Sequence, residues 1–349
     1  MNKFISIDGK KIGPDFKPYI IAELSANHNG DIERAYQIME RAVEAGADAI
    51  KIQTYTHETM TIDCDHEDFQ IKGGLWDGQS LYELYEKAHL PWEWNKLLFD
   101  KARELGITIF STPFDSTAVD LLEELNTPAY KIASFELIDL PLIARVAKTG
   151  KPMIISTGMG NLDEIEEAIF TAKENGCTEL VVLHCVSAYP VSASQYNLVT
   201  IADIANRFDV LTGLSDHTIE NATSVSAVAL GACLIEKHVT LDRSGGGADD
   251  SFSLEMDELE ALCKDTQTAW ESIGMVNYER TEAEKGNVAF RRSIYVVQDI
   301  KAGEQFTNDN IRIIRPGFGL PPKYFDEVLC HKAKVNILRG TALTRQLMK

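Results

Sequence analysis

Short β-rich runs alternate with amphipathic helical segments eight times along this chain, and this alternation constrains its fold more than any other feature. The runs are YIIAEL from Tyr19, AIKIQ from Ala49, TIFSTP from Thr108, AYKIAS from Ala129, MIISTG from Met153, LVVLHC from Leu180, LTGLSDH from Leu211 and LIEKHVT from Leu234. Eight β/α units over about 250 residues predict a TIM (β/α)8 barrel of the α/β class. An open, doubly wound sheet is the alternative, because a count of strands does not prove closure.

The segments between the runs carry helix signals. In DIERAYQIMERAVEAG, which begins at Asp31, apolar residues recur every three to four positions and Gly46 supplies the stop. Two similar segments end at Gly106 and Gly176. Ahead of the first run, Asp8-Gly9 predicts a hairpin that closes the barrel.

The connection between Gln53 and Thr108 is much longer than a helix requires. Connections of this length are usually functional. It predicts either a lid over a substrate or a surface excursion packed by its own Trp76, Trp92 and Trp94.

A second, smaller unit follows the barrel. We expect a catalytic domain over residues 1–278, a charged linker over 279–291 and a C-terminal domain over 292–349. The stretch SIYVVQDIKAGEQFT predicts two short strands around a turn at Gly303. About sixty residues form only a marginal core, so we expect this domain to dock on another surface.

Charge and cysteine content narrow the classes of function. A net charge of -19 argues against nucleic acid and against an anionic membrane as partners. No stretch approaches the roughly 20 apolar residues of a membrane span, and the first residues lack a signal peptide's apolar run. The six cysteines include no C-x-x-C pair, and we expect Cys185 and Cys233 to be small buried hydrophobes. A cytoplasmic protein with reduced cysteines is the expectation.

Polar residues gather where the predicted strands end, which is the catalytic face of such a barrel. They are Glu23, Lys51, Gln53, Thr112, Lys131, Ser134, Glu136, Ser156, Thr157, His184, Ser187, Ser215, His217, Glu236 and His238. Ion pairing would account for one or two such strands, but hardly for eight.

The run LIEKHVTL places an acid, a base and an imidazole in the middle of an apolar strand. Because side chains alternate along a strand, Glu236 and His238 share the inward face, and His217 does so on the neighbouring strand. Two imidazoles with Glu236 and Asp249 nearby predict a divalent metal site; two hydrogen-bonded core histidines are the alternative. Lys237 points the other way, and we expect it to form an ion pair on the helix side.

A second group combines cations with hydroxyls. Its members are Lys51, Lys131, Ser134, Ser156, Ser187 and Ser215. Such a group suits a small anion that carries phosphate. A Schiff base on a buried lysine is the alternative. The stretch RSGGGADDSF resembles a phosphate-binding glycine loop, although a flexible connector fits its composition equally well.

With these motifs in place, the chain resembles the sialic-acid synthase family, which condenses phosphoenolpyruvate with an amino-sugar aldehyde. The resemblance rests on IAELSANHNG, KIQTYT, STPFD, YKIAS, STGM, HCVSAYP, GLSDHT, IEKHVT, RRSIYVVQDIKAGE and IRPGFG, which run in order through both predicted domains. It implies that the C-terminal domain is an antifreeze-like (SAF) domain. It further implies a homodimer in which the SAF domain reaches the partner's barrel.

Three departures favour the pseudaminic acid branch of that family: SANHN, Ser187 within HCVSAYP, and KGGLWDGQSLYELYEKAHLPWEW. That branch uses 2,4-diacetamido-2,4,6-trideoxy-L-altrose. N-acetylneuraminate and legionaminate synthases share the chemistry and remain alternatives. A Schiff-base aldolase and a non-enzymatic sugar-binding protein are more distant ones.

The resemblance also assigns roles to residues. It implies that His217 and His238 bind a divalent ion, Mn²⁺ or alternatively Mg²⁺ or Co²⁺, and that Glu236 supports this site. Glu23 and Glu136 are the expected proton-transfer or sugar-hydroxyl partners. The expected substrate-binding residues are Lys51, Gln53, Thr112, Lys131, Ser134, Ser156, Ser187, Tyr189, Ser215, Asp249 and Arg315. The resemblance places Arg315, from IRPGFG, over the sugar end of the partner's barrel.

Overall fold

The computed structural model describes residues 4–73 and 76–349, which form two compact units. The first unit ends at Gly274 and the second runs from Met275 to Lys349. Within the described residues, no helix is both long and apolar enough to cross a membrane.

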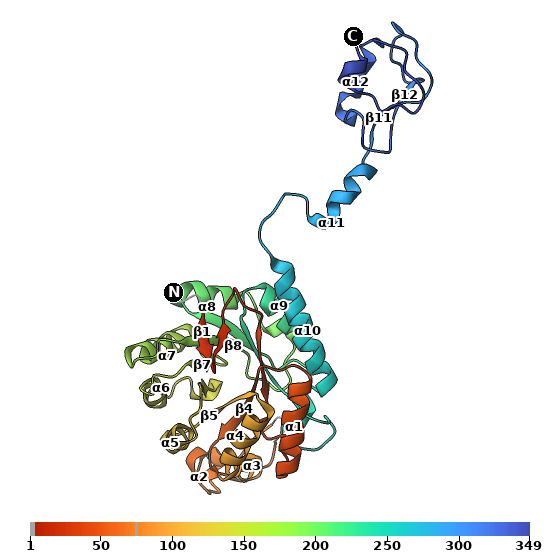
Figure 1. The fold of residues 1–349 in the computed structure, drawn as a ribbon. Coiled ribbons are helices and arrows are strands. Elements are labelled where there is room, and N and C mark those ends of the chain that lie inside the picture. The colour runs from red at the N-terminus through yellow and green to blue at the C-terminus, as the bar shows by residue number, and fades with distance from the viewer. Residues whose placement is uncertain (1–3, 74–75) are drawn as a thin grey trace. The chain divides into compact units, whose positions relative to one another are not determined.

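The first unit is a closed barrel of eight parallel strands, so the open-sheet alternative is wrong (Figure 1). The strands are β3 (Tyr19–Glu23), β4 (Ala49–Thr54), β5 (Thr108–Pro113), β6 (Tyr130–Ile132), β7 (Met153–Ser156), β8 (Leu180–Cys185), β9 (Leu211–Ser215) and β10 (Leu234–His238). They neighbour one another in chain order, and β10 closes the barrel against β3. The alternation of β-rich and helical segments therefore predicted the architecture correctly.

Helices surround the strands and bury their apolar faces against them. They are α1 (Ile32–Glu44), α4 (Trp94–Leu105), α5 (Ser116–Glu124), α6 (Leu140–Ala147), α7 (Leu162–Glu174), α8 (Thr200–Phe208), α9 (Ala222–Ala229) and α10 (Met256–Ile273). Gly46, Gly106 and Gly176 follow α1, α4 and α7 with φ of 93°, 68° and 104°, a left-handed conformation that glycine adopts at little cost.

An apolar plug fills the end of the barrel away from the polar strand ends. The predicted N-terminal hairpin, β1 (Ile5–Ile7) with β2 (Lys10–Ile12), supplies Ile5, Ile7 and Ile12 to it. These side chains pack with inward residues of the strands such as Ile21 and Phe110. The hairpin thus closes the barrel as predicted, and the polar side chains lie above an apolar layer.

The long connection after β4 holds α2 (His57–Met60), a 3₁₀ turn η1 (Glu67–Phe69) and α3 (Leu81–Ala88) before α4. Other short 3₁₀ turns, η2 (Ser134–Glu136), η3 (Ala193–Gln195) and η4 (Asp250–Phe252), follow β6, β8 and β10. Ser134 was expected on a strand, but β6 ends two residues earlier and Ser134 begins η2.

The second unit has its own core of Ile294, Val296, Ile300, Phe306, Ile311, Val328, Ala333, Ile337 and Leu343. It contains α11 (Glu282–Lys285), η5 (Gly286–Phe290), β11 (Ser293–Val296), β12 (Ile311–Ile314), η6 (Pro322–Tyr324), α12 (Phe325–Leu329) and η7 (Arg345–Leu347). The first run predicted around Gly303 is β11, but its partner is β12 and not residues 304–307. The segment expected as a linker, residues 279–291, contains all of α11 and all of η5.

Candidate active site

A cavity of about 230 Å³ opens at the carboxyl ends of the barrel strands. The predicted site residues that line it are Lys51, Gln53, Lys131, Ser134, Glu136, Ser156, Tyr189, Ser215, His217, Glu236, His238 and Asp249. Glu23 and Thr112 are fully buried and contact Lys51 from outside the lining. Arg315 belongs to the second unit.

Lys51, Lys131 and Glu236 form the floor of the cavity, and Glu23 pairs with Lys51 from outside its lining. Lys51 Nζ lies 2.6 Å from Glu23 Oε2 and donates a hydrogen bond to Thr112 Oγ1 at 3.1 Å. Glu236 Oε1 lies 3.9 Å from Lys51 Nζ and 3.7 Å from Lys131 Nζ. Glu236 was expected beside the metal site, and the structure brings it between the two lysines.

The charges of this floor are set by burial and by their neighbours. Burial lowers the pKa of Lys131. Although burial opposes the change, the charges of Lys131 and Lys51 lower the pKa of Glu236 and keep it ionised.

Two polar atoms of the floor face no protein partner. Within residues 4–73 and 76–349, Ser156 Oγ and Glu236 Oε2 are buried without a hydrogen bond. Leaving such a group unsatisfied costs about 1–3 kcal/mol. Because these two atoms belong to residues that line the same cavity as Lys51 and Lys131, they indicate a place for a small polar ligand.

The two predicted imidazoles meet at the wall of the cavity, with ring centroids 5.5 Å apart. His217 Nδ1 donates to the carbonyl oxygen of Val186 at 2.9 Å, which leaves Nε2 as a ligand. His238 Nδ1 is buried without a hydrogen bond in the described part of the chain, and Asp249 Oδ2 lies 3.9 Å from it. His217 Nε2 is left free to bind by the bond at Nδ1, and His238 Nδ1 has no hydrogen bond among the described residues. Such imidazole nitrogens fit a divalent ion.

The protein does not complete a metal cage at this place. Among the described residues, no group of three or more His, Cys, Asp or Glu side chains is arranged to hold an ion. Two imidazoles alone would leave several positions of a divalent ion for substrate and water, which is the arrangement of a catalytic rather than a structural site.

Aromatic rings cover the imidazole side of the cavity. The ring of Tyr189 lies 4.3 Å from that of His217 and 5.0 Å from that of Phe252, measured between centroids. From the long connection, Trp76 lies 6.5 Å from Tyr189, and Leu84 also lines the cavity. Of its two interpretations, the long connection is therefore a wall of the site and not a separate surface excursion.

Glu136 sits at the cavity with one carboxyl oxygen, Oε2, buried and without a hydrogen bond among the described residues. Burial raises its pKa to about 7. A carboxyl group that exchanges its proton near neutral pH suits general acid and base work.

The raised pKa predicts a pH-dependent gain in stability for Glu136→Gln. The folded protein holds this proton more tightly than the unfolded chain does, so the buried charge destabilises the wild type increasingly as pH rises from 4.5 to about 7. Glutamine removes that cost. We expect the variant to exceed the wild type in unfolding free energy by up to about 3 kcal/mol more at pH 8 than at pH 4.5.

Urea unfolding at the two pH values measures this difference. Glu260→Gln, at an exposed position on α10, is the control for replacing a carboxylate by an amide. A constant difference between Glu136→Gln and wild type across the range would contradict the raised pKa.

Several polar strand ends do not enter the cavity. His184 is bonded through Nε2 to the carbonyl oxygen of Tyr196, and Thr157 Oγ1 donates to the carbonyl oxygen of Leu183 at 3.2 Å. Ser187 lies against Gly158, where an added Cβ would come within 2.1 Å of its Oγ. His184, Thr157 and Ser187 are thus not among the residues that line the cavity, and the substrate-binding role expected of Ser187 stays a prediction.

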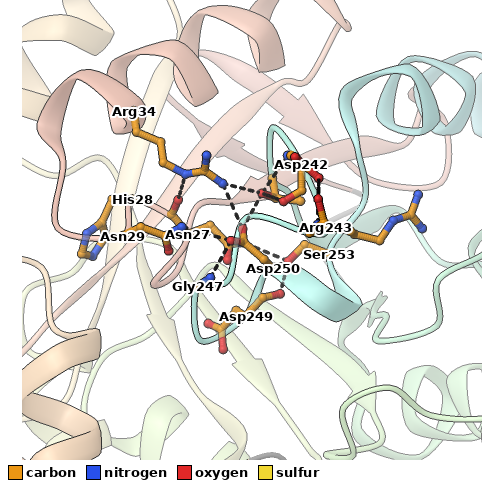
Figure 2. Close-up of polar contacts among 12 residues, drawn as sticks. Asn27, His28, Asn29, Arg34, Asp242, Arg243, Gly247, Asp249, Asp250 and Ser253 are labelled. Carbon is orange, nitrogen blue, oxygen red and sulfur yellow. Dashed lines mark hydrogen bonds and ion pairs between the residues drawn. The ribbon is translucent and has the colours of Figure 1, made fainter.

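The glycine-rich loop after β10 does not form a phosphate cradle. The carboxylate of Asp250 is buried under it and accepts hydrogen bonds from Gly247 N at 2.7 Å and from Asn29 Nδ2 at 3.0 Å (Figure 2). Arg34 Nη2 pairs with the same carboxylate at 3.2 Å. A carboxylate at this place would repel phosphate, and its bonds make the loop a fixed rather than a flexible connector.

Asp249 is held by separate contacts, because its Oδ2 is bonded to Ser25 Oγ and to Ala26 N at 3.4 Å. Sequence reasoning missed Arg34 and Asp250 because each looks like an ordinary charged surface residue.

Cys185 was predicted as a buried hydrophobe; it is buried, and its Sγ lies 4.0 Å from His217 Nδ1. Lys237 pairs with Asp216 outside the barrel, as predicted.

Comparison with known proteins gives two family matches, the NeuB family over residues 38–278 and the SAF domain over residues 291–346. The pseudaminic acid synthase of Campylobacter jejuni is 45% identical over 329 residues, which cover 94% of this chain and 96% of the relative. The N,N'-diacetyllegionaminic acid synthase of the same species is 37% identical over 317 residues, covering 90% and 95%. A crystal structure of N-acetylneuraminic acid synthetase from Leptospira borgpetersenii has 30% identity and a TM-score of 0.73, over 82% of this chain and 95% of that one.

Proposed function

The chain belongs to the NeuB family, and we propose that it condenses phosphoenolpyruvate with 2,4-diacetamido-2,4,6-trideoxy-L-altrose to give pseudaminic acid and phosphate. The observation that carries the substrate assignment is the identity to two synthases of one organism, 45% for the pseudaminic and 37% for the legionaminic enzyme. The reaction forms a C–C bond, which makes the protein a transferase.

The lysine floor is the proposed place for phosphoenolpyruvate. Lys51 and Lys131 offer two buried ammonium groups, and Ser156 Oγ, which has no hydrogen bond among the described residues, offers a hydroxyl donor. Donors that are fixed before the substrate arrives stabilise a phosphate and a carboxylate without reorganising. Thr112, Ser134 and Ser215 complete this proposed anion site.

The imidazole side is the proposed place for the sugar. His217 and His238 would hold a divalent ion, Mn²⁺ or alternatively Mg²⁺ or Co²⁺, whose Lewis acidity polarises the aldehyde. Asp249, Gln53 and Tyr189 line the same side and would contact the sugar.

The bond-forming step joins carbon 3 of phosphoenolpyruvate to the aldehyde carbon. Water then adds to the cationic carbon 2, and the tetrahedral intermediate expels phosphate by C–O cleavage. Glu136, with its pKa near 7, is the proposed proton-transfer group, and Glu23 holds Lys51 and Gln53 in place by contacts of 2.6 Å and 2.9 Å.

We further propose a homodimer in which the SAF domain of one chain serves the barrel of the other. Exposed apolar side chains on the loops after β6 and β7, namely Phe135, Ile138 and Met159, support a protein partner at this end of the barrel. In the second unit, Arg315 is exposed directly after β12. The carbonyl oxygen of its neighbour Pro316 accepts a hydrogen bond from Ser293 Oγ at 2.7 Å, which anchors the backbone beside the Arg315 side chain.

Lys131→Ala is expected to weaken phosphoenolpyruvate selectively. Its loss removes one of two buried cations from the proposed anion site, so KM for phosphoenolpyruvate should rise by about 10- to 100-fold while KM for the sugar changes little. Steady-state kinetics with each substrate varied in turn measure this split. Lys148→Ala, at the exposed end of α6, is the control. Unchanged kinetics for phosphoenolpyruvate would remove Lys131 from the anion site.

A panel of sugar aldehydes tests the function as a whole. Phosphate release from phosphoenolpyruvate is measured with the diacetamido-trideoxy-altrose, with the legionaminate precursor and with the N-acetylneuraminate precursor, each with and without chelator. The proposal requires the first sugar to be preferred and chelator to stop turnover. Preference for another sugar would reassign the branch, and trapping of pyruvate by borohydride in the presence of chelator would indicate a Schiff-base aldolase.

A further inference from the structure

The two imidazoles lie where the hydrogen-bonded pairing of their strands has stopped. The pairing of β9 with β10 ends at Ser215 and Glu236, and one further backbone bond joins Asp216 N to the carbonyl oxygen of Glu236 at 3.0 Å. The backbone N–H of His217 instead donates a hydrogen bond to the hydroxyl oxygen of Tyr196, at an N···O distance of 2.7 Å. His217 was expected on the strand, but it follows the strand by two residues, so the backbone ladder does not set its distance from His238.

Beyond the last backbone bond, an ion pair between side chains on the outer face of the barrel connects the two segments. Asp216 and Lys237 are the outward residues beside the two histidines, and Lys237 Nζ lies 3.1 Å from Asp216 Oδ2. The same ammonium donates to the carbonyl oxygens of Thr218 at 2.6 Å and Glu220 at 3.0 Å. Lys237 therefore ties β10 to the whole segment that carries His217.

The acidic partner is equally well fixed. Asp216 Oδ1 accepts from Thr218 N at 2.9 Å, and Oδ2 accepts from Ser224 Oγ at 2.6 Å. The two side chains of the ion pair are at most 2% exposed. A buried ion pair of this kind seldom stabilises more than an apolar pair would, because both charges must be desolvated. What it adds is a defined separation between the groups that it joins.

We propose that Asp216 and Lys237 are positioning residues that set the separation and orientation of His217 and His238. This inference rests on the proposed metal-binding role of the two histidines. Neither residue lines the cavity, so neither contacts substrate. They act through the backbone of the two imidazole-bearing residues.

The test compares one single and one double variant. Lys237→Met leaves the Asp216 charge buried without its cation and should lower stability strongly. Asp216→Asn with Lys237→Met removes both charges and keeps an acceptor for Thr218 N, so stability in urea should largely recover. Mn²⁺ affinity, measured by the electron paramagnetic resonance signal of the free ion, should nevertheless stay about 10- to 100-fold weaker than in wild type.

A partly exposed ion pair between two helices, away from the cavity, controls for charge removal itself. Glu40→Gln with Lys101→Met removes the ion pair of 2.5 Å between α1 and α4 and should leave Mn²⁺ affinity unchanged. If the double variant of Asp216 and Lys237 folds and binds Mn²⁺ as the wild type does, the positioning role is wrong. If wild type fails to bind Mn²⁺, or binds no better than His238→Ala, the metal assignment itself fails.

A crystal structure of the metal-free double variant judges positioning without the ion. The ring centroids, 5.5 Å apart in the wild type, should move by about 1 Å or more, or the His217 segment should become disordered. Rings that keep their separation and orientation would overturn the inference whatever the metal data are.

Discussion

An enzyme with His238→Ala is expected to lose its turnover by about 10³-fold or more while it keeps its fold. The variant lacks one of the two imidazoles that we assign to the proposed metal site, and Lewis-acid polarisation of a carbonyl stabilises the transition state by several kcal/mol. The structural cost should be small. In the part of the chain that the structure describes, His238 Nδ1 makes no hydrogen bond, and the ring contacts His217, Tyr189 and Phe252 only as a packing surface.

His184→Ala is the matched control for His238→Ala. His184 lies on β8, is partly buried and is bonded to a backbone carbonyl away from the cavity. Its loss should lower stability and leave metal content and turnover per folded molecule largely intact. Elemental analysis, circular dichroism and phosphate release measure the three quantities. A His238→Ala protein that is free of metal but turns over at a near-normal rate would refute the metal assignment.

The barrel could be predicted from the sequence because its signals are local. Each β-rich run carries its own apolar pattern, and Gly46, Gly106 and Gly176 mark helix ends through a backbone conformation that glycine prefers. Repetition then fixed the architecture, since eight such units fit a closed barrel. No single run had to be bounded accurately for this conclusion.

The site was harder to predict because inward and outward directions depend on where each strand ends. His184 and Thr157 have the residue types of a site, yet both bond to backbone carbonyls outside the cavity. Asp250 and Arg34 are brought together across 216 residues of sequence, and only the tertiary fold makes that carboxylate buried. The pattern of residue types shows which chemistry is present, whereas long-range packing decides which members take part.

Two nearly inactive variants, Arg315→Ala and His238→Ala, are expected to regain activity when their chains form mixed dimers. Arg315→Ala should reduce turnover strongly, because the proposal assigns this exposed guanidinium to the sugar of the partner's barrel. Chains with Arg315→Ala and with His238→Ala are then co-expressed with two affinity tags, and dimers that carry both tags are purified. In the proposed arrangement, one site of each mixed dimer combines the intact barrel of the Arg315→Ala chain with the intact SAF domain of the His238→Ala chain.

The mixed dimers should regain up to about half of the wild-type activity per dimer, because the other site carries both defects. If the SAF domain acted on the barrel of its own chain, every site would carry one defect. The mixed dimers would then stay as inactive as their parents. Arg312→Ala, which changes an exposed arginine of β12 three residues earlier, is the control for general damage to the SAF domain and should keep its activity. The mixed dimers thus show whether the SAF domain acts on the partner's barrel or on its own. Only an SAF domain that acts on the partner's barrel can assemble a complete site from two defective chains.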